Sequence, residues 1–399
     1  MRVLLTGASG LIGTRLAECL TQAYQVEVHA LVRRLGTVGA ARLARGAGVR
    51  LFAGDVLDAD AVMQAAAGCT HLVHCAADST ASAARQQAVM ITGTRHALAA
   101  AQRLGMERLV HFSSAAVHDP ARSGRIIRED APLNGWFAYA RAKIHAESLV
   151  RDAHRTGGLS AVILRPTSVW GPWSVTWTMS AARLLLQGVP FLPEQGRGVA
   201  NLVYLDNLVD AVWLALTRPE AVGQTFLIND DTPLTWGELY RGYARSLGVS
   251  LRDLPARPHV VETWAVSIRN ATAVLRRAVA GQTRSPAQVL REAYTHVPIV
   301  RDVVRCVPEG LRQFLRRSVT AHEQTLAVRS GSCPSMDGPA FLPVNRLDRP
   351  SWELYTSAGR YANDTAKRIL GWKPRVTFEE ALHRTCEWMA YAGLTRRPR

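Results

Sequence analysis

Short apolar runs alternate with stretches of helical spacing along the first half of the chain. The runs are apolar at successive positions rather than at every second one, which is typical of strands buried on both faces of a sheet. We predict strands at residues 3–5, 26–32, 49–52, 71–75, 108–113, 160–164 and 225–228. Between the first two, Leu11, Ile12, Leu16 and Leu20 recur on one helical face. Because strands separated by helices imply βαβ units, the pattern predicts an α/β fold with a doubly wound parallel Rossmann sheet.

A glycine-rich turn joins the first predicted strand to the first predicted helix. Glycines are needed where the chain turns sharply and the backbone must approach a pyrophosphate, and the helix N-terminus offers that anion free N–H groups. The turn therefore predicts a dinucleotide site that includes Gly7, Ser9, Gly10, Leu11, Ile12 and Gly13.

The end of the second strand indicates which dinucleotide is bound. A carboxylate there would bind the ribose hydroxyls of NAD(H), but this strand ends in Arg33 and Arg34. Two guanidinium groups suit a 2′-phosphate. We therefore expect NADP(H), with NAD(H) as the alternative.

Tyr139 and Lys143 lie four residues apart on a predicted helix, so they share one face. A neighbouring ammonium favours the phenolate, so we expect Lys143 to lower the pKa of Tyr139 and allow proton transfer to or from a substrate oxygen. Ser113 and Ser114 end the fifth strand, at the edge where open α/β sheets bind ligands.

Together these residues resemble the extended short-chain dehydrogenase/reductase family, which includes the NAD(P)-dependent epimerase/dehydratases. The resemblance covers about residues 1–250 and 355–392, and further matching segments are 54–56, 74–77, 93–94, 164–172, 202–208 and 370–375. It implies a catalytic set of Ser114, Tyr139 and Lys143. It also implies that Tyr139 and Lys143 contact the cofactor, together with Asp55, Val56, Cys75, Ala76, Ala77, Pro166, Ser168 and Val169.

The chain departs from the family pattern at three places, and one of them bears on which reaction it catalyses. Met90 replaces a frequent asparagine, and His118 replaces a usual tyrosine. The family's dehydratases carry Asp-Glu where Ala115 and Ala116 stand, so dehydration is disfavoured. We expect an NAD(P)(H)-dependent oxidoreductase that transfers a hydride to or from a carbonyl or alcohol carbon. The alternatives are a nucleotide-sugar epimerase with retained NAD and a non-catalytic dinucleotide-binding regulator.

The length of 399 residues suggests two or three domains. We expect a dinucleotide-binding domain of residues 1–165 and about 199–229. About 166–198 and 230–399 would form a smaller, mostly helical substrate-binding domain with a basic insertion at about 250–350. Five aromatic residues near the site motifs are candidates to line an apolar pocket: Trp136, Phe137, Trp170, Trp173 and Trp177.

Charge and cysteine content bear on partners and location. Of 48 basic residues only three are lysines, and the net charge is +16, yet no nucleic-acid-binding pattern accompanies it. The spacing of apolar and arginine positions in residues 250–330 predicts amphipathic basic helices, which leaves a peripheral membrane contact open beside simple packing on the substrate domain. The six cysteines show no zinc spacing, so no metal is expected. We expect a cytoplasmic enzyme with a small-molecule substrate, with peripheral attachment to the inner membrane face and a homodimer left open.

Overall fold

The computed structural model describes residues 1–78, 82–119, 126–135, 137–188, 192–249 and 349–394. All of these residues fall in one compact unit. The predicted basic insertion, apart from its last two positions, and Trp136 lie outside the described residues. None of the described helices is long and apolar enough to cross a membrane.

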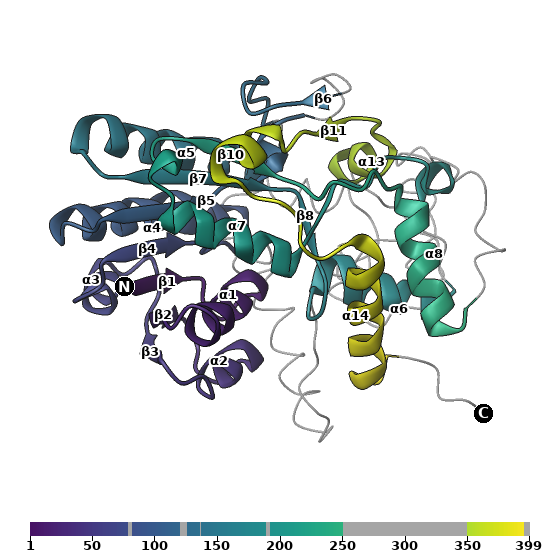
Figure 1. Ribbon diagram of the computed structural model, residues 1–399, viewed down its shortest axis with the longest axis horizontal. Helices are drawn as coiled ribbons and strands as arrows, with labels where there is room; N and C mark the ends of the chain where they lie inside the picture. Colours follow the sequence, from purple (N-terminus) through teal and green to yellow (C-terminus); the bar gives the residue numbers. More distant parts are fainter. Residues whose placement is uncertain (79–81, 120–125, 136, 189–191, 250–348, 395–399) are drawn as a thin grey trace, which may run out of the picture. The chain divides into compact units, whose positions relative to one another are not determined.

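A seven-stranded parallel sheet forms the centre of this unit (Figure 1). Its order is β10-β7-β5-β4-β1-β2-β3, so the chain moves outward from β1 to one edge, returns, and moves outward to the other. The strands are β1 (Arg2–Thr6), β2 (Glu27–Val32), β3 (Val49–Ala53), β4 (His71–His74), β5 (Arg108–Phe112), β7 (Ala161–Pro166) and β10 (Thr225–Ile228). The predicted doubly wound sheet is thereby confirmed, and the direction of winding reverses between β1 and β4.

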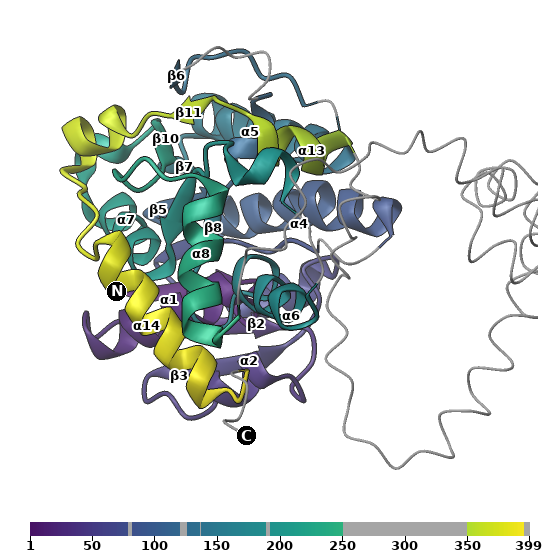
Figure 2. The same ribbon diagram turned by 90° about the vertical axis from the view of Figure 1, so that its right-hand side faces the viewer.

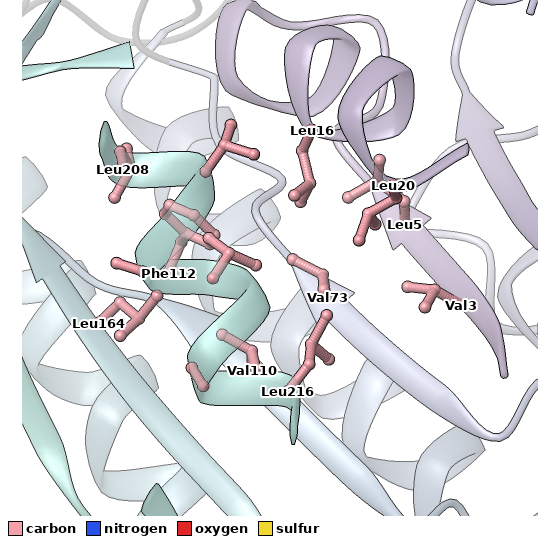
Figure 3. Close-up of a cluster of buried hydrophobic side chains, with 14 of the residues drawn as sticks. Val3, Leu5, Leu16, Leu20, Val73, Val110, Phe112, Leu164, Leu208 and Leu216 are labelled. Carbon is pink, nitrogen blue, oxygen red and sulfur yellow. The ribbon is translucent and has the colours of Figure 1, made fainter. Parts of the chain in front are cut away.

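Helices cover both faces of the sheet because its strands are apolar on both sides. They are α1 (Leu11–Gln22), α2 (Val38–Leu43), α3 (Ala59–Ala66), α4 (Ala83–Arg103), α5 (Ala138–Gly157) and α7 (Leu205–Thr217). On one face, Leu16 of α1 and Leu208 of α7 belong to the same buried apolar cluster as Phe112 of β5 (Figure 3). On the other face, α3, α4 and α5 contribute side chains to a second apolar cluster, among them Val62, Ala97 and Val150.

Most of the remaining described elements form a smaller, mostly helical part, as predicted (Figure 2). Its helices are α6 (Ser180–Leu186), α8 (Trp236–Leu247), α13 (Arg349–Thr356) and α14 (Phe378–Tyr391), with short turns η2 (Val175–Met179) and η3 (Pro193–Gly196). Three further short turns lie by the main sheet: η1 (Ala115–Val117) follows β5, and η4 (Pro219–Ala221) and η6 (Ala366–Leu370) contribute to its core. Two small sheets pair β8 (Ser168–Trp170) with β9 (Leu202–Tyr204), and β6 (Ile126–Ile127) with β11 (Arg360–Tyr361). Fully buried aromatic side chains fill the centre of the smaller part, among them Trp170, Trp236 and Tyr240.

Candidate active site

A cavity of about 590 Å³ lies at the carboxyl ends of β4, β5 and β7. This is the edge of an open parallel sheet at which ligands bind. Of the residues predicted from the sequence to form the site, ten line this cavity: Leu11, Ile12, Cys75, Ala77, Ser114, Tyr139, Lys143, Pro166, Ser168 and Val169. The topology therefore gathers residues from five separate stretches of the chain around one space.

Helix α5 carries two of the predicted catalytic residues into the cavity. It begins directly after Phe137, so Tyr139 lies in its first turn and Lys143 follows one turn later on the same side. The helix ends at Gly158, whose φ of 63° is a left-handed conformation that glycine adopts without strain. The long helix is held against the sheet by buried Ala142, Ala146 and Val150.

Ser114 and Tyr139 both line the cavity, and their hydroxyl groups lie close enough together for Ser114 to favour the ionised form of the phenol and so lower its pKa. Ser114 precedes the short turn η1, and its oxygen accepts a hydrogen bond from the backbone N–H of Ala116 at 3.2 Å. Because that contact uses an acceptor position, the hydroxyl proton of Ser114 remains available for the phenol oxygen. A substrate oxygen placed between the two groups would meet both a hydrogen-bond donor and a proton source.

Lys143 lies at the base of the cavity with only 3% of its surface exposed. Its Nζ donates to the carbonyl oxygen of Phe112 at 2.6 Å and lies 5.9 Å from the centroid of the Tyr139 ring. Burial lowers the pKa of Lys143 to about 8. Burial also raises the pKa of Tyr139, and the neighbouring Ser114 hydroxyl only partly opposes it. The prediction that the Tyr139 pKa is lowered is therefore wrong, because burial of the phenol is the largest influence on it.

A buried ion pair fixes α5 to the sheet beneath these residues. Glu147, one turn beyond Lys143, receives two hydrogen bonds from Arg165 of β7, at 2.8 and 2.7 Å. Arg151 adds a third at 2.5 Å. Sequence reasoning missed this pair, although Tyr139, Lys143 and Glu147 recur every four residues and so share a helix face.

His118 lines the cavity but cannot serve there as an acid. Its Nδ1 donates to the carbonyl oxygen of Pro132 at 3.3 Å, and its Nε2 accepts from Arg165 at 3.0 Å. A carbonyl only accepts and a guanidinium only donates, so the ring is neutral with its proton on Nδ1. Burial and the Arg165 charge lower the His118 pKa to about 4.

The glycine turn has the geometry that a dinucleotide pyrophosphate requires. Gly7 has a φ of +68°, and a Cβ on it would lie 2.8 Å from the backbone of Ala76. A Cβ on Gly13 would lie 2.4 Å from the Gly7 carbonyl oxygen. Gly10 is the N-cap of α1, and its lack of a side chain leaves the first N–H groups of that helix available to an anion. These features fit the dinucleotide expected from the sequence.

The residues predicted for the adenosine half lie at the ends of β2 and β3, outside the cavity lining. Arg33 forms an ion pair with Asp78 at 2.7 Å, and Asp55 forms one with Arg85 of α4 at 2.5 Å. The side chain of Arg34 makes no ion pair within the described residues. The sequence analysis did not predict Asp78 and Arg85 as site residues, because neither lies in the glycine turn or in a segment that matches a family motif.

The five aromatic candidates have different positions. Phe137 and Trp177 line the cavity, and Trp177 stacks on buried Trp236 with ring centroids 5.2 Å apart. Trp170 is 1% exposed and belongs to the core. Trp173 packs against Trp388 and is not among the lining residues.

Comparison with known proteins shows which proteins this chain is similar to. Residues 3–229 match the model of the NAD dependent epimerase/dehydratase family. The chain is 34% identical over 274 residues to a 3-diazoavenalumate denitrifying reductase of Streptomyces sp. The aligned region covers 64% of this chain and 85% of the relative. It is 28% identical over 238 residues to a 4-hydroxy-2-methyl-3-oxo-4-farnesyl-3,4-dihydroquinoline-1-oxide ketoreductase of Stigmatella aurantiaca, over 59% of this chain and 70% of the relative.

The fold is also that of solved structures. The crystal structure of the dTDP-glucose 4,6-dehydratase DesIV from Streptomyces venezuelae, with NAD and TYD bound, superposes with a TM-score of 0.65. The match covers 99% of each chain at 22% identity, and so shows a shared fold.

Proposed function

The chain belongs to the NAD-dependent epimerase/dehydratase family of extended short-chain dehydrogenase/reductase enzymes, and from that premise we propose that it is an NADP(H)-dependent carbonyl reductase or alcohol dehydrogenase. The observation that carries this proposal is the convergence of the Ser114 and Tyr139 hydroxyls in a cavity above buried Lys143. A reductase needs such a pair, because the oxygen of a carbonyl must be held and protonated as its carbon receives a hydride.

Each of the three side chains has a distinct task. Ser114 donates a hydrogen bond that orients the substrate oxygen, and Tyr139 transfers its phenolic proton to that oxygen in the reductive direction. Lys143 stays fixed on the Phe112 carbonyl in the described state and supplies a positive charge below the phenol. The nicotinamide cofactor, when bound, supplies the hydride. In the oxidative direction Tyr139 takes the hydroxyl proton instead.

The Arg33 and Arg34 pair supports NADP(H) rather than NAD(H) as the cofactor. The guanidinium of Arg33 lies at the carboxyl end of β2, beside Asp55 at the end of β3. A phosphate on the ribose would find a cation there, whereas β2 itself does not end in the carboxylate that would bind free ribose hydroxyls. The substitution Arg33→Asp should reverse the preference, and an unchanged preference for NADPH would remove the argument.

The cavity lining supports an apolar carbonyl compound as the substrate. Around the two hydroxyls the described lining offers Ala115, Ala116, Phe137, Trp177 and Leu354. Lys143 is the one lysine or arginine among the described lining residues, and its ammonium is held by the main chain. A nucleotide sugar carries two phosphates that need cationic partners. The ketoreductase activity in the name of the Stigmatella relative agrees with an apolar carbonyl substrate.

We assign the two tasks to two parts of the chain. Residues 1–165 and about 199–229 would bind the dinucleotide, and about 166–198 and 230–399 would bind the substrate. The cavity lining supports this division, because Ser174, Thr176 and Trp177 of the second part face Ser114 and Tyr139 of the first across one space.

One preparation tests both the reaction and the substrate class. The purified protein is first denatured, and any released dinucleotide is identified by mass spectrometry. NADPH and NADH oxidation is then measured with cyclic and aromatic ketones, β-keto esters and nucleotide sugars. We expect that the denatured protein releases no NAD. We also expect the protein to oxidise NADPH when an apolar ketone is present. Retained NAD together with interconversion of a nucleotide sugar would instead establish an epimerase.

A further inference from the structure

At the adenosine end, four side chains of alternating charge form a connected row. Arg33 contacts Asp78 at 2.7 Å, and Arg85 contacts the same carboxylate oxygen of Asp78 at 3.7 Å. Arg85 also contacts Asp55 at 2.5 Å. The four come from the ends of β2 and β3, the segment after β4 and the first turn of α4. The fold thus places a second guanidinium, from a distant helix, beside the Arg33 predicted from the sequence.

We propose that Arg33 and Arg85 together form a subsite for a ribose 2′-phosphate, and that Asp78 is an internal counter-ion whose place the phosphate takes. This inference rests on the proposed NADP(H) dependence and extends it to two residues outside the family pattern.

The shared oxygen of Asp78 is the first argument. One carboxylate oxygen lies near both guanidiniums, so this is a point at which an anionic oxygen is stabilised from two sides. A phosphomonoester has three such oxygens and a charge of about −1.5 to −2 near neutral pH. It can therefore engage both arginines at once and bind them more strongly than a single carboxylate does.

Exposure is the second argument. The side chains of Arg33 and Arg85 are 47% and 37% exposed, so a ligand can reach them. The Asp78 side chain is only 10% exposed. Its carboxylate therefore stays close to the arginines when they turn to a phosphate, and it repels that phosphate. Asp78 therefore weakens phosphate binding, whereas the two arginines strengthen it.

Asp55 is the third argument, because it keeps Arg85 in place. One oxygen of Asp55 accepts from the N–H of Leu57 at 3.1 Å, which leaves the other for Arg85. Burial alone would raise the Asp55 pKa, but the Leu57 N–H and the charges of Arg85 and Arg33 hold it below its usual value. Asp55 is therefore a fixed anion at neutral pH that can hold Arg85 without itself facing the phosphate.

Calorimetric titration of the full chain with adenosine 2′,5′-bisphosphate and with AMP tests the subsite without any turnover. These two probes differ by the 2′-phosphate alone. We expect Arg85→Met to weaken bisphosphate binding by about tenfold, the loss of one charge-assisted contact, and AMP binding by less than threefold. Asp78→Asn should tighten bisphosphate binding by about three- to tenfold and leave AMP binding unchanged.

The matched control is Arg95→Met, which removes the same charge from an exposed position of the same helix. It should change neither affinity by more than twofold. Equal losses for both probes in Arg85→Met, or weaker bisphosphate binding in Asp78→Asn, would overturn the proposal. If the unaltered protein binds the two probes equally, the NADP(H) proposal itself is wrong. A preference for the bisphosphate that survives Arg85→Met would overturn the Arg85 assignment alone.

Discussion

The two ends of the proposed cofactor site hold their charges in opposite ways. At the catalytic end, Arg165 and Glu147 are at most 2% exposed, and Lys143 is buried beside them on a backbone carbonyl. At the adenosine end, Arg33 and Arg85 are more than a third exposed and share the carboxylate of Asp78. One end is fixed by burial, and the other is a set of exchangeable surface ion pairs.

This difference follows from what each end must do. A proton donor must be held at one position relative to the reacting oxygen, so its supporting charges are paired and taken out of water. Buried charges cannot lose a partner without a large free-energy cost, whereas exposed pairs contribute about 0–1 kcal/mol each. The adenosine end can therefore release a carboxylate and accept a phosphate at little cost to folding.

The sharpest test of the catalytic end removes one oxygen atom. Tyr139→Phe should lower kcat by roughly 10²–10⁴-fold, the usual contribution of a positioned proton donor, because Ser114 holds the substrate oxygen by a hydrogen bond but does not transfer a proton to it. Binding of NADPH should change by less than threefold, measured by titration of the full chain. Steady-state rates with an apolar ketone supply the kcat. Full activity in this variant would contradict the assigned proton transfer.

Sequence patterns predicted the sheet because they depend on nearest-neighbour chemistry. A strand buried on both faces must be apolar throughout, and a turn that approaches a phosphate needs glycine, so β1, α1 and the Gly7 turn could be read directly. All seven predicted strands of the main sheet match the structure to within two residues.

The supporting charges could not be read in the same way. Glu147 pairs with Arg165, and Arg85 with Asp55, across 18 and 30 positions of the sequence. In a chain with 48 basic residues no local pattern marks which arginine is paired. The direction of the Tyr139 pKa shift failed for a related reason. The pKa is raised because the phenol is buried, and how deeply a side chain is buried depends on packing between segments that are far apart in the sequence.

The contrast in folding cost can be measured with two matched substitutions. Arg165→Met leaves the buried Glu147 carboxylate with Arg151 as its remaining ion-pair partner among the described residues, so we expect a loss of about 3–5 kcal/mol in the free energy of unfolding. Arg85→Met breaks an exposed pair and should cost less than about 1 kcal/mol. Urea denaturation followed by circular dichroism gives both values. Equal losses would show that burial does not distinguish the two ends.

Lys143 gives a smaller expected change in stability than Arg165, and the sign of that change is unusual for a residue in an active site. Its pKa is about 8 in the folded chain, against an ordinary 10.5, so burying the ammonium costs at most about 3 kcal/mol at pH 7. Lys143→Met removes that cost and loses the hydrogen bond to Phe112, worth about 1 kcal/mol. We therefore expect an inactive variant that is more stable than the unaltered protein by about 1–2 kcal/mol at pH 7.

The pH dependence of that difference identifies its cause. Between pH 8 and 10.5 the unfolded chain binds the Lys143 proton while the folded chain has released it, so Lys143 makes the unaltered protein more stable as pH rises. The advantage of Lys143→Met should shrink through this window, and urea denaturation of both proteins at several pH values would follow it. Other titrating groups cancel because both proteins contain them. An advantage that stays constant with pH would mean that packing of the methionine, and not removal of a buried charge, stabilises the variant.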